Sequence, residues 1–135
     1  MNSILKSLAF VIVFIAGLSI IGQSQNYVAR YENTDQTVHR DSKDRLVMSY
    51  TIEGPETEAE IEVIRQYYSR YGIFESFTIS PGAEKGVWNV EETTIPGIKF
   101  KILKKLFITS GITTVYVNGE SYPVETFKRK MLKQN

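Results

Sequence analysis

Few residues of this chain could do chemistry, and most of them are carboxylates. The sequence contains no cysteine, which excludes a disulfide framework, a thiolate metal site and a thiol nucleophile. Glu91 and Glu92 are adjacent in a predicted strand, where consecutive side chains point to opposite faces, so the two carboxylates cannot converge on one atom. Near predicted strand ends, the carboxylates are those of Glu53, Glu91 and Asp44. Their spacing in the sequence does not indicate that they form a common site. A small carboxylate-dependent hydrolase is therefore kept only as an alternative.

The remaining chemical signals favour a protein that is not an enzyme. His39 is the single histidine and lies in a polar stretch, whereas a general base must be held rigidly against its partner. Glu56, Glu58, Glu60 and Glu62 crowd the predicted start of a helix, where the helix dipole already favours acidic side chains. No glycine-rich motif of the phosphate-binding type is present. We therefore expect no cofactor and no metal site.

Surface contacts are the more plausible source of function. Basic residues gather at Lys99, Lys101, Lys104 and Lys105 in a predicted helix, where an amphipathic helix places its solvated face, and again near the C-terminus. The C-terminal run, from residue 124 to 132, could be a short amphipathic helix that meets a membrane or a partner, or that docks on the domain. Three apolar side chains are expected on the otherwise polar face of the sheet. The predicted partner-contact residues are Phe74, Val87, Tyr116, Lys128, Arg129 and Lys130.

The first 24 residues predict where the protein works. Lys6 precedes an unbroken apolar run from residue 8 to 21, which ends in Gly22, Gln23 and Ser24. A short basic start, an apolar stretch and small residues at the end are typical of a secretory signal peptide. A retained N-terminal membrane anchor is the alternative, although the run is shorter than the roughly 20 residues that span a bilayer. Loss of Lys6 would leave equal numbers of basic and acidic residues, so no global field favours nucleic acid.

The elements after the leader follow one another in a regular order. Residues 25–44 are polar without a sustained period and are predicted to be a flexible lead-in. A strand at 45–53 precedes a helix that begins at a capping box, Thr57 to Glu60, and carries an apolar stripe of Ile61, Ile64, Tyr68 and Tyr71. Strands at 73–79 and 87–92 predict a hairpin. A second helix follows residues 95–97 and ends at Gly111, and strands at 112–117 and 120–124 flank an Asn118-Gly119 turn.

This order predicts an α+β protein, specifically a ferredoxin-like βαββαβ two-layer sandwich with a C-terminal hairpin arm, spanning residues 45–135. Alternation along the strands supports it, because one set of side chains can lie under the two helices. That set comprises Leu46, Met48, Tyr50, Ile52, Phe77, Ile79, Trp88, Val90, Val115 and Val117.

Residues 45–117 resemble the heavy-metal-associated, copper-chaperone type of ferredoxin-like domain in the order of their elements and in the Gly111-Ile112 start of the last strand. That family binds metal through two cysteines between its first strand and first helix. The corresponding loop here runs from Glu53 to Thr57 and has none. The resemblance therefore implies a fold and no metal ligation.

The expected function follows from these patterns together. We expect an exported, periplasmic or secreted, accessory protein of a bacterial envelope that contacts a protein partner and does not bind nucleic acid. The open sheet face or the basic C-terminal arm would make the contact. A self-assembling structural protein is a further alternative, because the terminal hairpin leaves a sheet edge that could pair with another strand.

Overall fold

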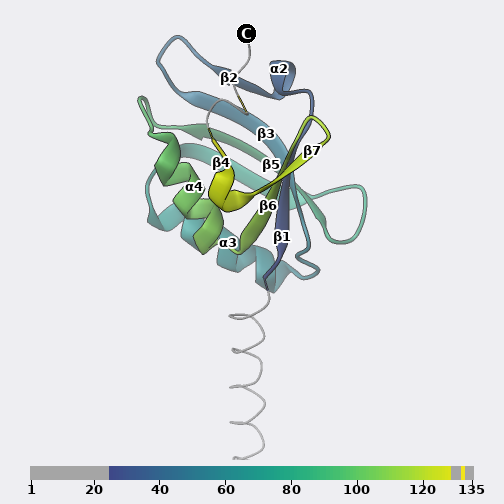
Figure 1. Ribbon diagram of the computed structural model, residues 1–135. Coiled ribbons are helices and arrows are strands. Elements are labelled where there is room, and N and C mark those ends of the chain that lie inside the picture. The colour runs from purple at the N-terminus through teal and green to yellow at the C-terminus, as the bar shows by residue number, and fades with distance from the viewer. Residues whose placement is uncertain (1–24, 129–131, 133–135) are drawn as a thin grey trace, which may run out of the picture.

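The computed structural model describes residues 25–128 and Leu132, in which strands and helices combine as an α+β protein (Figure 1). Seven strands form one sheet: β1 (Tyr27–Tyr31), β2 (Val38–Arg40), β3 (Leu46–Glu53), β4 (Phe74–Pro81), β5 (Val87–Thr94), β6 (Ile112–Val117) and β7 (Glu120–Pro123). The helices are the one-turn α2 (Thr34–Thr37) and the longer α3 (Glu58–Arg70) and α4 (Phe100–Thr109). A 3₁₀ turn, η1 (Val124–Thr126), follows β7.

The ferredoxin-like prediction is wrong, because an additional strand lies in the middle of the sheet. The strand order is β4-β5-β3-β1-β6-β7. In a βαββαβ ferredoxin-like sheet the first and last strands are neighbours, and these would be β3 and β6. Here β1 separates them: it pairs antiparallel with β3 and parallel with β6. The sheet is therefore wider than the predicted four strands plus an arm.

The strand β1 comes from residues 25–44, which the sequence analysis predicts to be a flexible lead-in. Its alternation explains its position, since Tyr27, Ala29 and Tyr31 are buried while Val28 and Arg30 are only partly covered. After α2 the chain continues as β2, which pairs with residues 46–48 of β3. This is the same edge of β3 whose residues 51–53 pair with β1. Most of the supposed lead-in thus has regular structure, and its first strand is central.

The predicted helices are present and cover one face of the sheet (Figure 1). The N-terminus of α3 is capped as the sequence predicts, with the Glu60 backbone N–H donating to Oγ1 of Thr57 at 3.3 Å. The reciprocal half of the capping box differs. Glu60 Oε1 accepts from the Thr57 hydroxyl, and its Oε2 accepts from the Tyr27 hydroxyl at 2.8 Å, so this carboxylate ties α3 to β1.

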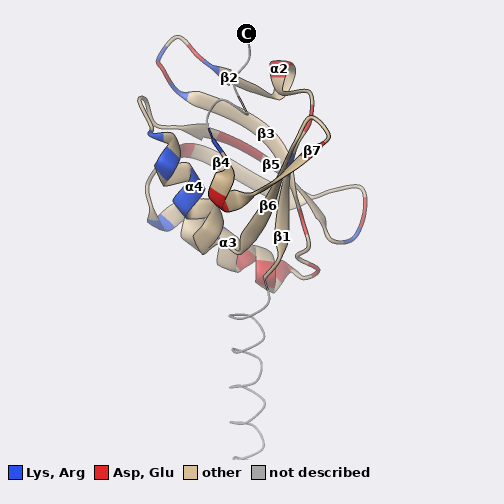
Figure 2. Ribbon diagram, in the orientation of Figure 1, with Lys and Arg blue, Asp and Glu red and all other residues tan. Residues whose placement is uncertain are grey.

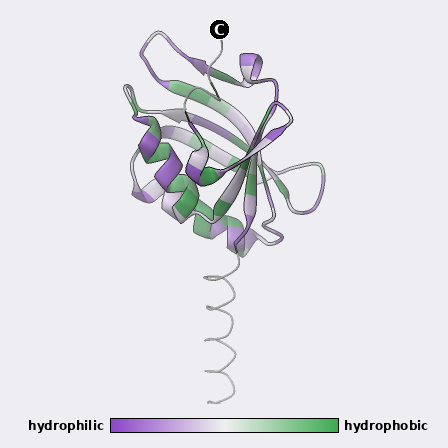
Figure 3. Ribbon diagram, viewed as in Figure 1, coloured by the Kyte–Doolittle hydropathy of each residue, from purple (hydrophilic) through white to green (hydrophobic). Residues whose placement is uncertain are grey.

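The core lies between the helices and the strands, where most of the predicted inward set is buried. Hydrophobic residues, green in Figure 3, occur on both helices and along the central strands. Of the predicted set only Phe77 is partly exposed, and Tyr71, predicted for the stripe of α3, is 40 % exposed. Aromatic rings fill the centre: Tyr31 stacks on Tyr50 with ring centroids 4.5 Å apart, and Phe107 lies 5.9 Å from Tyr50. Burial of such rings is the main source of stability in a chain without disulfides.

The two predicted hairpins are confirmed. Strands β4 and β5 pair antiparallel, as do β6 and β7. At the second turn, Asn118 and Gly119 have φ values of 51° and 89°, the positive angles that a type I′ turn needs. The chain then packs back on the helix side, where Phe127 lies 4.8 Å from Phe100 between ring centroids, and Leu132 is buried. Of the two alternatives for the C-terminal run, its described residues fit docking.

Candidate functional site

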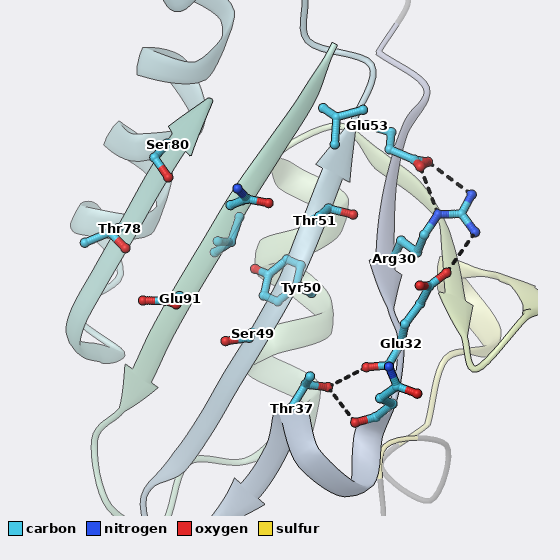
Figure 4. Close-up of a pocket in the computed structure, with 14 residues that line it drawn as sticks. Arg30, Glu32, Thr37, Ser49, Tyr50, Thr51, Glu53, Thr78, Ser80 and Glu91 are labelled. Carbon is cyan, nitrogen blue, oxygen red and sulfur yellow. Dashed lines mark hydrogen bonds and ion pairs between the residues drawn. The ribbon is translucent and has the colours of Figure 1, made fainter. Parts of the chain in front are cut away.

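The candidate site is a shallow groove on the face of the sheet that no helix covers. It has a volume of about 620 Å³ and crosses four neighbouring strands, β4, β5, β3 and β1, with Thr37 of α2 and the two residues before this helix at one end (Figure 4). We call this surface the open-face groove. The residues that line it are Arg30, Glu32, Asn33, Thr37, Ser49, Tyr50, Thr51, Glu53, Thr78, Ser80, Val87, Asn89, Val90 and Glu91.

Strand register brings the groove residues into rows across the sheet. One row runs through Ser80, Asn89, Thr51, Arg30 and Tyr116, each the direct neighbour of the next on an adjacent strand. Side chains alternate between the two faces of a sheet along each strand. A residue of this row therefore faces away from the helices if the residues before and after it in the sequence are buried on the helix side. Trp88, Val90, Tyr50 and Ile52 are such buried neighbours. The polar face is therefore a consequence of the same alternation that builds the core.

Arg30 is the most constrained charged residue of the groove. Its Nε and Nη2 donate to the two carboxylate oxygens of Glu53 at 2.8 and 3.2 Å, and its guanidinium lies 4.2 Å from the centroid of the Tyr116 ring. The hydrogen bonds that Arg30 donates to Glu53 raise the pKa of Arg30 above its ordinary value. Both side chains of the ion pair are about 30 % exposed, so the pair contributes little to stability. Its effect is to hold a planar donor group in a fixed place.

Other side chains of the groove have unused hydrogen-bonding capacity. Within the part of the chain that the structure describes, no hydrogen bond or ion pair is made by the side chains of Ser49, Thr51, Thr78, Ser80, Asn89 and Glu91. These hydroxyl, amide and carboxylate groups lie at the surface, where solvent can bond them in the free protein. A ligand that covers them must replace those bonds, since an unpaired polar group costs free energy when buried.

The geometry does not bring the predicted carboxylates together. Glu53 and Glu91 both line the groove, but Glu53 is opposite Val87, and Glu91 is opposite Ser49, four residues along β3. Their Cα atoms are thus about 14 Å apart, given the usual rise of a strand and the usual spacing between neighbouring strands. Glycoside hydrolases place their two carboxyl groups about 5–10 Å apart. Asp44 lies outside the groove, in a loop where it contacts Arg40 at 3.3 Å.

The predicted contact residues fall at three different places. Val87 lines the groove and Tyr116 lies beside it, on the same face. Phe74 does not join them, because a shift in the register between β4 and β5 turns it toward α3, where its ring lies 5.2 Å from that of Tyr68. Lys128 is exposed and directly follows Phe127, whose ring packs against Phe100 of α4. Arg129 and Lys130 lie outside the described residues.

Below the groove, on the buried side of β5, lies an acidic side chain whose burial the sequence analysis did not predict. Glu92 is only 2 % exposed, and its Oε2 accepts a hydrogen bond from the Tyr50 hydroxyl at 3.2 Å, while its Oε1 has no partner among the described atoms. Burial raises the pKa of Glu92 from 4.5 to about 8. The alternation Trp88, Val90, Glu92 could have indicated this position, because the third residue of that inward series had to be buried too.

The structure adds no support for a metal site or for chemistry at His39. His39 is exposed on β2, opposite Val47. Across residues 25–128 and 132 there is no group of three histidine or acidic side chains that could hold a metal ion. In the same residues no helix has both the length and the apolar character that crossing a membrane requires.

Comparison with known proteins adds no relative from which a function could be inferred. The chain matches no protein-family model, no curated protein and no solved structure. The resemblance to heavy-metal-associated domains gains no support from these comparisons, and the strand order described above differs from the fold that it implies.

Proposed function

We propose that this chain is a non-enzymatic binding module of a bacterial envelope, exported to the periplasm or beyond, and that it contacts a protein partner through its open-face groove. Export is supported by the basic and apolar character of residues 1–24. The lack of cysteine in an exported chain favours a bacterial source.

One observation carries the proposal of a partner: the groove is wide, and six of its polar side chains have no hydrogen-bond partner among the described residues. Its free groups are spread across β4, β5 and β3, so a ligand that satisfies them must extend over several strands. A polypeptide provides donors and acceptors at such spacings through its backbone and side chains. Arg30, fixed by Glu53 and Tyr116, adds a positioned charge at one side of the groove.

Site-specific crosslinking in the native envelope tests the proposal. A photoreactive amino acid replaces Asn89, in the middle of the groove, and in a matched chain it replaces Ser69, which is exposed on α3. We expect Asn89 to yield one dominant protein adduct that Ser69 does not yield. The double substitution Thr78→Lys and Thr51→Lys, which fills the groove with long charged side chains, should abolish this adduct.

Three results would contradict the proposal. Equal adducts from both positions would mean that contact is not specific to the groove, and an adduct that survives the two lysine substitutions would mean the same. An adduct between two copies of this chain would favour self-assembly over a separate partner. Thermal unfolding of each variant shows whether a lost adduct reflects a lost fold.

A further inference from the structure

The helix α4 carries three lysines, and a fourth is its N-cap residue; none of the four is paired with an acidic side chain in the described part of the chain. Lys99, Lys101 and Lys105 are exposed, and Lys104 is partly covered. The ion pairs that hold the rest of the described structure together are made by Arg30, Arg40, Arg45 and Arg65, and none of them reaches these lysines. Lys104 donates to a backbone carbonyl, that of Glu125. Figure 2 shows the basic residues gathered along α4.

The positions of these lysines destabilise the helix α4. Lys99 is the N-cap residue and makes no capping hydrogen bond, and the first turn holds no acidic residue. Cations at a helix N-terminus oppose the helix dipole, and Lys101 and Lys105 add a repulsive pair at four-residue spacing. By contrast, α3 has a capped N-terminus, two acidic residues in its first turn and Arg70 in its last. The charges of α4 are therefore not explained by stability, and such local conflicts are expected at functional surfaces.

An exposed apolar side chain completes this surface. Ile108 is 48 % exposed, more than any other large hydrophobic residue that the structure describes. It follows Lys101, Lys104 and Lys105 at helical spacing, so the four side chains share one stripe. The opposite stripe, with Leu103, Leu106 and Phe107, is buried in the core. Figure 3 shows hydrophilic and hydrophobic residues side by side on α4.

We infer that this stripe of α4, Lys101, Lys104, Lys105 and Ile108, is a contact surface for a membrane with anionic phospholipids. Lysines near such a surface are attracted by its negative potential, and an apolar side chain among them can enter the boundary between headgroups and acyl chains. The stripe lies on the outside of a helix, which suits headgroup charges spread over a plane. A soluble polyanion would satisfy the lysines but would leave Ile108 unused.

The inference goes beyond the proposed function and does not rest on it. Because α4 covers one face of the sheet and the open-face groove lies on the other, a membrane against α4 would leave the groove directed away from the lipid (Figure 1). A domain held in this way could be in contact with a membrane and with a protein partner at the same time.

A fluorescent label on α4 tests the membrane contact. Since the chain has no cysteine, Ile108→Cys provides a unique site for nitrobenzoxadiazole, a dye that responds to an apolar environment. The full chain is incorporated into vesicles of phosphatidylcholine alone or with phosphatidylglycerol. We expect a blue shift of the emission only with phosphatidylglycerol and its loss at high salt, because screening weakens attraction between exposed charges.

Matched variants make the test specific. Lys101→Gln with Lys105→Gln should abolish the shift, whereas Lys43→Gln with Lys85→Gln, which removes two exposed lysines from loops, should retain it. A label at Thr78→Cys, on the open face, should not respond. The inference is overturned if position 108 behaves alike in both lipids, if Thr78 shifts as strongly, if the α4 lysines prove dispensable, or if soluble polyaspartate alone produces the shift.

Discussion

The Tyr50 hydroxyl lies 3.2 Å from Oε2 of Glu92, in a part of the core that solvent does not reach. The same hydroxyl is 2.7 Å from that of Tyr68, so a chain of hydrogen bonds runs from α3 through Tyr50 of β3 to the carboxyl group on β5. Burial, followed by the charge of Glu92, raises the pKa of both tyrosines well above the ordinary value. Glu92 is therefore the group of this cluster that titrates within the physiological range.

Stability should fall as the pH rises through this range. The unfolded chain releases the Glu92 proton near pH 4.5, whereas the folded protein keeps it until about pH 8. Folding thus requires proton uptake between these values, and the free energy of unfolding decreases by up to about 5 kcal/mol across them and changes little above. Urea denaturation at pH 5, 6.5 and 8, followed by fluorescence of the buried Trp88, measures this loss.

Glu92→Gln is the matched variant for that prediction, because the amide keeps the size of the carboxyl group and cannot lose a proton. Its stability should be within about 1 kcal/mol of the wild type at pH 5 and should exceed it by several kcal/mol at pH 8. Parallel pH profiles for the two proteins would show that Glu92 is ionised in the fold without penalty and would refute the assignment.

The cap of α3 makes a second prediction. Thr57→Ala removes the oxygen that accepts from the Glu60 backbone N–H, and the loss of such an N-cap destabilises a protein by about 1 kcal/mol. For a domain of this size that corresponds to a decrease of about 4–8 °C in Tm. Thr57→Ser retains the acceptor and should retain most of the stability. A Tm of Thr57→Ala equal to that of the wild type would indicate that water replaces the cap at no cost.

A third prediction concerns β1, which pairs with β3 on one side and β6 on the other. A chain that begins at residue 33 loses this strand, and with it three buried side chains and the hydrogen bonds of both neighbours. It should lack cooperative unfolding, and its Trp88 emission should resemble that of unfolded protein. A chain that begins at residue 25 keeps the strand and is the control. Cooperative unfolding of the shorter chain would show that β1 is an accessory to the sheet.

The same strand shows what sequence patterns can and cannot predict. The helices α3 and α4 and both hairpins were predicted correctly because local signals specify them: the Thr57 cap, the Ile61, Ile64 and Tyr68 stripe and the Asn118-Gly119 turn act within a few residues. The one-turn helix α2 was not predicted. The strand β1 has the right alternation, but five residues between polar segments are too few to distinguish a central strand from a few anchors. Its neighbours in the sheet, β3 and β6, are distant in the sequence, and alternation alone does not specify which strands pair.

The candidate site, too, could be predicted from the sequence only in part. Alternation predicted which side chains of β3 and β5 point away from the helices, and the structure confirms that Glu91 and Glu92 lie on opposite faces. Phe74 was placed on the wrong face, since a register shift at the start of β4 interrupts the period of two. Arg30 could not be assigned to the groove at all, because its position depends on the unexpected place of β1. Local alternation thus defines faces, and long-range pairing defines sites.

A fourth prediction compares two glycines with nearly the same backbone angle. Gly111 has a φ of 91° and Gly119 a φ of 89°, so alanine is strained at either position by about 1–2 kcal/mol. At Gly119 nothing lies within 4 Å of the added Cβ, whereas at Gly111 the Cβ of Gln25 would be only 2.5 Å away. Gly111→Ala should therefore be the more destabilising by a further 1–3 kcal/mol, roughly the cost of overpacking.

The cause of this difference can be tested in the same experiment. The Gly111 carbonyl also accepts from the Tyr27 N–H at 3.0 Å, so a displaced Gln25 would disturb the first hydrogen bond of β1. In a chain that begins at Tyr27, the close contact is absent, and the two alanine variants should lose similar amounts of stability. If Gly111→Ala remains the worse variant there, its cost arises from the strand pairing itself. Equal losses in the longer chain would instead show that Gln25 moves aside freely.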